Sequence, residues 1–223
     1  FANEPPKNSP LIGTKNLIMT PHLGASTTEA QEKVALQVAE QISDYLKTGA
    51  ITNAVNTFSL TASEHNIVQP YLKLSEQLGG FAGQLTENAI KKIAVEFEGA
   101  VSKINTQPLI QTIIHSLLKK NFDGVNVINS VAVAKTKSIQ ITEIKHEKAV
   151  EYQACITLTI ETEKQTRSVS GTLFGGKPRI VNVKGIKIEA ELSRYNLYIS
   201  NEDKPGFISN LSKILADNKI NIA

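Results

Sequence analysis

The residue of this chain best placed for acid–base chemistry is His22. It lies in a short turn, because Pro21 favours an extended conformation just before it and a helix is expected just after it. Catalytic side chains often lie on such loops between rigid elements, and an imidazole gives and takes protons near neutral pH. Glu4, if folded against the ring, would orient it and raise its pKa. A histidine and a carboxylate form one half of an acid–base site.

The helix expected after this turn has its own start and stop signals. Ser26 and Glu29 have the spacing of a capping box, which predicts that the helix begins at about Thr27. Apolar residues then recur every three or four positions up to about Lys47, and Gly49 fits the residue that follows the last turn. A histidine before a helix is more often a cap or core residue than a catalyst. A catalytic role for His22 therefore depends on the residues around it.

The string NLIMTPHLGAST at 16–27, with Glu-Pro-Pro at 4–6, closely resembles the D-2-hydroxyacid dehydrogenases, and within them the long-form phosphoglycerate dehydrogenases. The resemblance implies an NAD-dependent oxidoreductase that oxidises 3-phospho-D-glycerate (3-phosphoglycerate) to 3-phosphohydroxypyruvate in L-serine biosynthesis. It implies that His22 is the general base, that Glu4 pairs with it, and that His22 and Gly24 contact the cofactor. The substrate-orienting arginine and the glycine-rich NAD loop of the family are expected upstream of Phe1.

The resemblance divides the chain into three parts. Residues 1–56 resemble the end of a doubly wound NAD-binding and substrate domain. Residues 57–192 resemble an α+β intervening domain with an antiparallel sheet, and residues 193–223 resemble the first βαβ unit of a ferredoxin-like ACT domain. The chain opens with Phe1 rather than Met and closes where a strand begins, so we interpret it as an inactive fragment of a longer enzyme.

Hydrophobic periodicity and turn residues give a coarse set of elements that fits this division. Further helices are expected at about 66–85, 108–120 and 206–217, and the segment 126–134 is ambiguous between helix and strand. Turns are expected at Gly175-Gly176 and at Gly185. Strands are expected at about 91–98, 139–145, 150–161, 166–174, 179–184, 186–192 and 195–199, and again from Ile220.

Lys177, Arg179, Lys184 and Lys187 place four cations within eleven residues. In the enzymes that this chain resembles, basic residues here bind a phosphate or the substrate as an allosteric anion, and Arg179, Lys187 and Lys177 match those positions. Where a further basic residue is expected, the chain has Glu191, whose carboxylate repels an anion if it faces the same pocket. A solvated strand face is the alternative interpretation.

Asn201, Asp203 and Asn221 match positions that bind the amino-acid effector, L-serine, in the ACT domains of these enzymes. A Pro-Gly turn at a helix N-terminus exposes backbone N–H groups to a carboxylate. Turn chemistry alone also explains Asn and Asp at such places. A regulatory amino-acid- or anion-binding module without catalysis of its own is therefore one alternative function. Another D-2-hydroxyacid dehydrogenase is a second, and L-serine dehydratase, which needs several cluster-binding cysteines, is a third.

Two glycine-rich strings imitate nucleotide-binding loops. The segment 171–178 nearly spells the phosphate-binding loop, but it ends in Pro178 and lies between strands, whereas that loop runs from a strand into a helix. The segment 79–83 lacks the dinucleotide spacing and fits close helix packing instead. The chain is therefore not expected to hold NAD by itself.

Composition limits which other classes of protein this chain could belong to. A net charge of +3 is too small to indicate nucleic acid, and with 41% apolar residues but no long apolar run the chain is expected to be globular, cytoplasmic and free of membrane contacts. The histidines have no ligand spacing, so no metal site is expected. The single cysteine, Cys155, is expected to be buried in a reducing compartment. The family implies a homo-oligomer.

Overall fold

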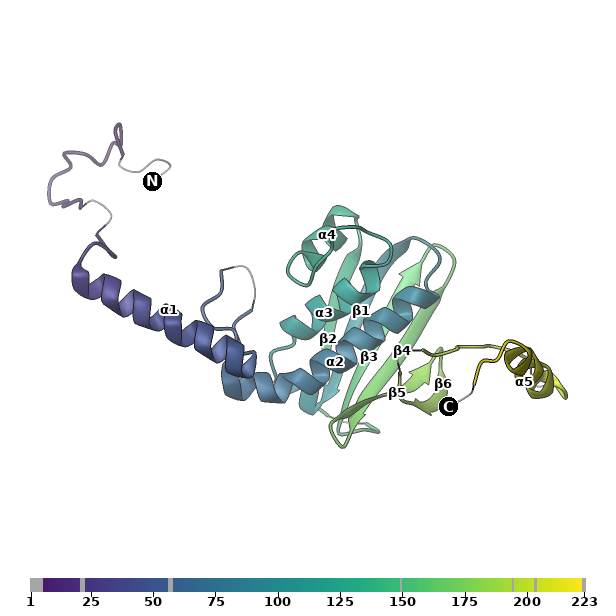
Figure 1. Cartoon of the computed structure of the whole chain (residues 1–223). Helices are drawn as coiled ribbons and strands as arrows, with labels where there is room; N and C mark the ends of the chain where they lie inside the picture. The colour runs from purple at the N-terminus through teal and green to yellow at the C-terminus, as the bar shows by residue number, and fades with distance from the viewer. Residues whose placement is uncertain are drawn as a thin grey trace. The chain divides into compact units, whose positions relative to one another are not determined.

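The structure is a computed structural model that describes residues 6–20, 23–55, 58–148, 150–193, 195–202 and 204–221. The chain forms two compact units, Phe1–Glu191 and Leu192–Ala223, and Figure 1 shows their elements. Each unit is described by itself.

A six-stranded sheet in the order β2-β1-β3-β4-β5-β6 forms the centre of the first unit. All its pairs are antiparallel except β1 with β2, which is parallel. The sheet is therefore mixed, whereas the sequence predicted an antiparallel one. The reason is the helical crossover between β1 and β2, since parallel neighbours need such a connection. The strands are β1 (Ile90–Gly99), β2 (Gln140–His146), β3 (Ala154–Thr162), β4 (Thr166–Phe174), β5 (Lys177–Val183) and β6 (Ile186–Ala190).

Two helices, α2 (Ala62–Leu85) and α3 (Gln107–Leu118), lie side by side over one face of this sheet (Figure 1). Alternate residues of the central strands point toward them and form the core. The crossover also contains η1 (Ala100–Lys103) and α4 (Ser130–Thr136), so the ambiguous segment at 126–134 is helical from Ser130 onward. Fully buried strand residues include Ile93, Val95, Phe97, Ile156, Leu158 and Ile180.

The first helix, α1 (Thr28–Thr48), starts and ends close to the predicted positions. Its N-cap is Thr27 rather than Ser26, because the Thr27 hydroxyl accepts a hydrogen bond from the Ala30 amide at 3.2 Å. Gly49 ends the helix with φ of 74°, as predicted. No residue of α1 is buried. Its apolar side chains, Val34, Leu36, Val38, Ile42, Tyr45 and Leu46, are all exposed.

Helix α2 begins four residues earlier than the sequence predicted. Thr61 and Glu64 form a capping box, in which the Thr61 hydroxyl accepts from the Glu64 amide and the Glu64 carboxylate accepts from the Thr61 amide. The polar segment before residue 66 is therefore the first turn of the helix. The hydrogen bond from the Thr61 backbone also lowers the pKa of Glu64.

Among its described residues, the second unit has one helix, α5 (Phe207–Asp217), close to the predicted 206–217. The predicted strand at 195–199 is wrong, because these residues are not in a strand. Of the strand predicted from Ile220, only Ile220 and Asn221 are described, and neither is in a strand. A strand needs a hydrogen-bonded neighbour to be stable, and none of the described residues in this unit provides one.

Glycines 79 and 83 bring α2 against the backbone of α3, which confirms the prediction of close helix packing. A Cβ at Gly79 would lie 2.4 Å from the Ile113 carbonyl oxygen, and one at Gly83 would lie 2.7 Å from that of Leu117. Real Cβ atoms are not found at such distances, so any larger residue there must push the helices apart. Gly80, between them, has open space around its Cβ position.

We expect Gly79→Ala and Gly83→Ala each to lower the free energy of unfolding by about 1–3 kcal/mol, because the added methyl groups overpack the α2–α3 contact. Urea denaturation monitored by circular dichroism measures the change. Gly80→Ala is the matched control and should raise stability by about 0.5–1 kcal/mol, the usual gain for alanine in a helix. Equal effects at all three glycines would contradict the packing argument.

Candidate functional site

The catalytic residues predicted from the sequence, His22 and Glu4, lie outside the described residues, and their roles stay predictions. Gly24, the predicted cofactor contact, is described and exposed. It lies in a turn that is closed by the Ser26 amide, which donates to the Leu23 carbonyl at 3.1 Å. This turn leads directly into α1, so the local arrangement is the one that the sequence predicted for the segment after the histidine.

The predicted anion site lies on the sheet face away from α2 and α3. Gly171 of β4 packs against Leu74 of α2. Side chains alternate along a strand, so the next residue, Thr172, points to the opposite face. Arg179 is opposite Thr172 in the sheet register and therefore shares that face. Lys187 lies opposite Asn182, whose partner in β4 is Ser170. The alternation therefore places Arg179 and Lys187 on one face.

Each of these two cations already has a carboxylate partner. The Arg179 guanidinium lies 2.8 Å from the Glu191 carboxylate, and the Lys187 ammonium lies 2.7 Å from that of Glu151. The hydrogen bond to Glu151 raises the pKa of Lys187. The third predicted member, Lys177, is exposed at the start of β5. An anion at this face therefore has to compete with the protein's own carboxylates.

The surroundings of the single cysteine make its thiol unreactive. Cys155 is 7% exposed, which confirms its predicted burial, and burial raises the pKa of its thiol to about 11. Thiolates are the reactive form, so this thiol is not a nucleophile near neutral pH. Among the residues that the structure describes, no cluster of three or more His, Cys, Asp or Glu side chains could hold a metal ion.

The predicted effector residues lie in the second unit. The Asn201 side chain donates to the Glu202 carbonyl at 2.8 Å, and Asn221 is exposed. Asp203 lies outside the described residues. Gly206, with φ of 92°, immediately precedes α5. These contacts are those of a turn before a helix, and effector binding stays a prediction.

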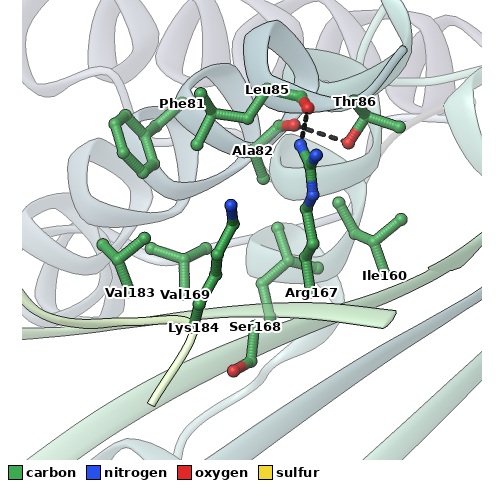
Figure 2. A pocket seen from close by; sticks show the side chains of 11 residues that line it. Phe81, Ala82, Leu85, Thr86, Ile160, Arg167, Ser168, Val169, Val183 and Lys184 are labelled. Carbon is green, nitrogen blue, oxygen red and sulfur yellow. Dashed lines mark hydrogen bonds between the residues drawn. The ribbon is translucent and has the colours of Figure 1, made fainter. Parts of the chain in front are cut away.

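A small cavity that the sequence did not predict lies under the last turn of α2. It measures about 20 Å³ and has an apolar wall that includes Phe81, Leu85 and Ile160. Figure 2 shows two cationic side chains, Arg167 and Lys184, directed from the sheet toward the end of α2. The wall residues are Phe81, Ala82, Leu85, Thr86, Leu158, Ile160, Ser168, Val169 and Val183.

The two cations reach the cavity in different ways. Arg167 shares the face of β4 that carries the buried Val169, and its Nη1 donates to the Leu85 carbonyl. Lys184 follows β5 in a two-residue turn with φ of 52°, next to Gly185 at 83°. One sequence signal could have revealed Arg167, namely a cation on the apolar face of a strand. No sequence signal distinguishes Lys184, because it lies among the cations at 177–187 that were predicted to face the anion site.

The glycine-rich strings have structural roles. Gly79 and Gly83 lie in the helix contact, and the segment 171–178 forms the β4–β5 hairpin, with Gly175 and Gly176 at φ of 54° and 77° in its turn. The hairpin confirms that this segment lies between strands. These two strings therefore do not build a dinucleotide loop. No helix among the described residues is both long enough and apolar enough to cross a membrane.

Comparison with known proteins gives a consistent result. A family model described as the D-3-phosphoglycerate dehydrogenase intervening domain matches residues 67–184, just over half of the chain. Over its whole length the chain is 32% identical to a D-3-phosphoglycerate dehydrogenase of Bacillus subtilis, covering 43% of that protein. It is 36% identical to one of Synechocystis, covering 41%, and 31% identical to one of Methanocaldococcus jannaschii, covering 43%. The chain thus spans about two fifths of the length of these relatives.

We expect Glu191→Gln to strengthen phosphate binding at Arg179 roughly two- to fivefold, since an exposed ion pair holds its partners by about 0.2–1 kcal/mol. Thermal shift titration with sodium phosphate, against sodium gluconate at matched ionic strength, measures the change. Glu163→Gln is the control, because it removes another exposed carboxylate, one that pairs with Lys91. An equal gain in the control would mean that only net charge matters.

Proposed function

The chain belongs to the family of D-3-phosphoglycerate dehydrogenase intervening domains, and from this premise we propose that it is part of an NAD-dependent phosphoglycerate dehydrogenase. The proposed reaction is the oxidation of 3-phospho-D-glycerate to 3-phosphohydroxypyruvate in L-serine biosynthesis. The observation that carries the proposal is the joint occurrence of the family match at 67–184 and the dehydrogenase string around His22. Relatives with this name match over the whole chain.

In the proposed reaction, His22 accepts the proton of the substrate C2 hydroxyl as the C2–H bond breaks. NAD supplies the chemistry of a hydride acceptor, so the alcohol loses one proton and one hydride and becomes a ketone. Glu4 stabilises the imidazolium that forms and holds the ring in position. Loss of His22 would therefore remove the base itself, whereas loss of Glu4 would lower the pKa of that base.

The NAD site of the proposed enzyme is not built by the two glycine-rich strings of this chain, which have the packing and hairpin roles described above. Only the cofactor contacts assigned to His22 and Gly24 belong to this chain in the proposal.

The exposed apolar stripe of α1 supports a function within a larger protein. Val38, Ile42 and Leu46 are between 46% and 76% exposed, and a continuous apolar helix face is normally covered by another element. In the proposal this face packs on the catalytic region, and the turn at 23–26, which follows His22 in the sequence, would lie beside the substrate. We also propose that the enzyme is a homo-oligomer, as the family implies.

A second candidate function is a regulatory module that binds an anion or an amino acid without catalysis of its own. The observation in its favour is that the family model matches the intervening domain rather than a catalytic domain. Arg179, Lys187 and Lys177 are the proposed anion contacts, and Asn201, Asp203 and Asn221 are the proposed contacts of an L-serine effector. The two candidates are compatible, since one protein can contain both functions.

We expect His22→Gln in the full-length enzyme to lower kcat roughly 10²–10⁴-fold, because the hydroxyl proton loses its acceptor. Steady-state assay of NADH formation from 3-phosphoglycerate measures this. His146→Gln is a matched control, since His146 pairs with Glu96 at 2.8 Å on the sheet, and it should retain normal turnover. Glu4→Gln should lower the pKa of the rate profile, because the imidazolium loses an opposite charge. A fully active His22 variant would exclude it from the mechanism.

The chain of 223 residues is expected to show no NAD binding, since its glycine-rich strings serve helix packing and a hairpin turn. Calorimetric titration with NAD measures this directly. The full-length enzyme under the same conditions is the positive control. A micromolar dissociation constant for the chain alone would contradict this assignment.

A further inference from the structure

Strand β2 (Gln140–His146) forms one edge of the sheet, since the strand order places only β1 beside it. Five of its seven residues are exposed, so no other described element covers it. Among the described residues, 140–146 make no backbone hydrogen bond apart from those of the sheet. The outer side of β2 therefore presents backbone N–H and C=O groups to which another strand can bind.

The opposite edge, β6 (Ile186–Ala190), is built differently. It has five residues, and its pairing with β5 shifts register between Ile180 and Asn182. Short strands and bulges are features by which proteins protect a sheet edge against pairing. Strand β2 has neither feature, because its pairing with β1 runs over seven residues without a shift, and it contains no proline. The open edge is therefore β2.

Side chains of opposite charge flank an apolar one on β2. Glu143 is opposite the buried Val95 in the register, so it lies on the helix side of the sheet, and Lys145 shares that side. The Glu143 carboxylate accepts a hydrogen bond from the Thr106 hydroxyl, and the Lys145 ammonium lies 3.1 Å from it. Ile144, between them, points to the other face and is 38% exposed.

We propose that β2 pairs in antiparallel fashion with β2 of a second copy of this chain, about a two-fold axis at Ile144. In this register Ile144 lies opposite its own copy, and Glu143 of each chain lies opposite Lys145 of the other. Opposite charges across two strands stabilise their pairing, whereas like charges destabilise it. Both chains use the same surface, as a two-fold interface requires, and the two six-stranded sheets join edge to edge.

The neighbouring registers are less favourable. An axis at Glu143 places that carboxylate opposite its own copy, and an axis at Lys145 does the same to the ammonium. A slip of one residue exchanges the faces of one strand, so an axis between two residues places Ile144 opposite Glu143 or Lys145 of the second copy. The charge pattern of β2 therefore selects the register centred on Ile144.

Sedimentation velocity of the full 223-residue chain over a range of concentrations tests the pairing. A single strand pair buries little surface, so we expect a reversible equilibrium between monomer and dimer. Glu143→Lys and Lys145→Glu should each raise the dissociation constant roughly tenfold or more, because each creates two pairs of like charges across the axis. Glu163→Lys makes the same charge change in the exposed β3–β4 loop and should leave the dissociation constant unchanged.

An equimolar mixture of the two β2 variants separates contacts between chains from contacts within one chain. In the mixed dimer the introduced lysine faces the introduced glutamate, and native Lys145 faces native Glu143. Association should therefore return to within about threefold of the wild-type dissociation constant. The Glu143–Lys145 contact within each chain remains broken in the mixture, so recovery has to come from the interface. A mixture that stays monomeric would overturn the proposal.

Disulfide formation gives a second, independent measurement of the register. Residues directly opposite each other have Cβ atoms about 4.5–5.5 Å apart, so Ile144→Cys should cross-link across the axis after a small adjustment. Thr142→Cys is the matched control on the same face of β2, since it and its copy are about 13 Å apart in this register. Ile144 is partly exposed and native Cys155 is buried, so the variant should fold without competition from the native thiol.

The proposal does not depend on the proposed reaction, because every residue it uses lies in β2. A wild-type chain that stays monomeric at all concentrations would overturn it and would leave the edge to a segment of another protein. Cross-linking of the Thr142 variant as fast as the Ile144 variant would also overturn it. Neither result would change the expected loss of turnover in the His22 variant.

Discussion

The close approach of α2 to α3 is the contact on which the rest of the first unit depends. Gly79 and Gly83 let the backbone of one helix touch carbonyl groups of the other, which sets the spacing of the pair. Leu74 of α2, fully buried, then reaches the sheet at Gly171, where a Cβ would lie 2.7 Å from its Cδ1. Glycines on α2 and on β4 thus allow α2 to pack closely against both α3 and the sheet. Interiors packed this closely transmit a change at one contact to the next.

The position of α2 also decides how the two faces of the sheet carry positive charge. On the helix side, the carbonyl of Leu85 lies where Arg167 can donate to it, so a backbone group and the helix dipole compensate the guanidinium. On the other side, Arg179 is compensated by the carboxylate of Glu191. That second compensation is partly exposed to solvent and is weak. Cations that look alike in the sequence therefore differ in their electrostatic surroundings.

The sequence predicted most helices and strands of the first unit, because apolar periodicity records which face is buried. It missed the start of α2 because the prediction followed apolar periodicity, although Thr61 and Glu64 have the spacing of a capping box. It also missed the parallel pairing of β2, because strand direction depends on the crossover path rather than on local pattern. The strand predicted at 195–199 failed for a related reason: alternation shows that a segment could pair, not that a partner is present. The sequence also did not predict that Arg167 and Lys184 line one pocket, because the β4–β5 register and the end of α2 bring them together.

The junction between α1 and α2 contains several direct contacts. The chain between the helices forms a hairpin in which the Leu60 amide donates to the Ile51 carbonyl at 2.6 Å, and Ala50 and Leu60 are buried. His65 of α2 lies against Gly49, 3.1 Å from the position of a Cβ. These contacts distinguish the junction from a flexible polar linker. The described contacts therefore tie the end of α1 to the start of α2, whereas α1 itself has no buried residue.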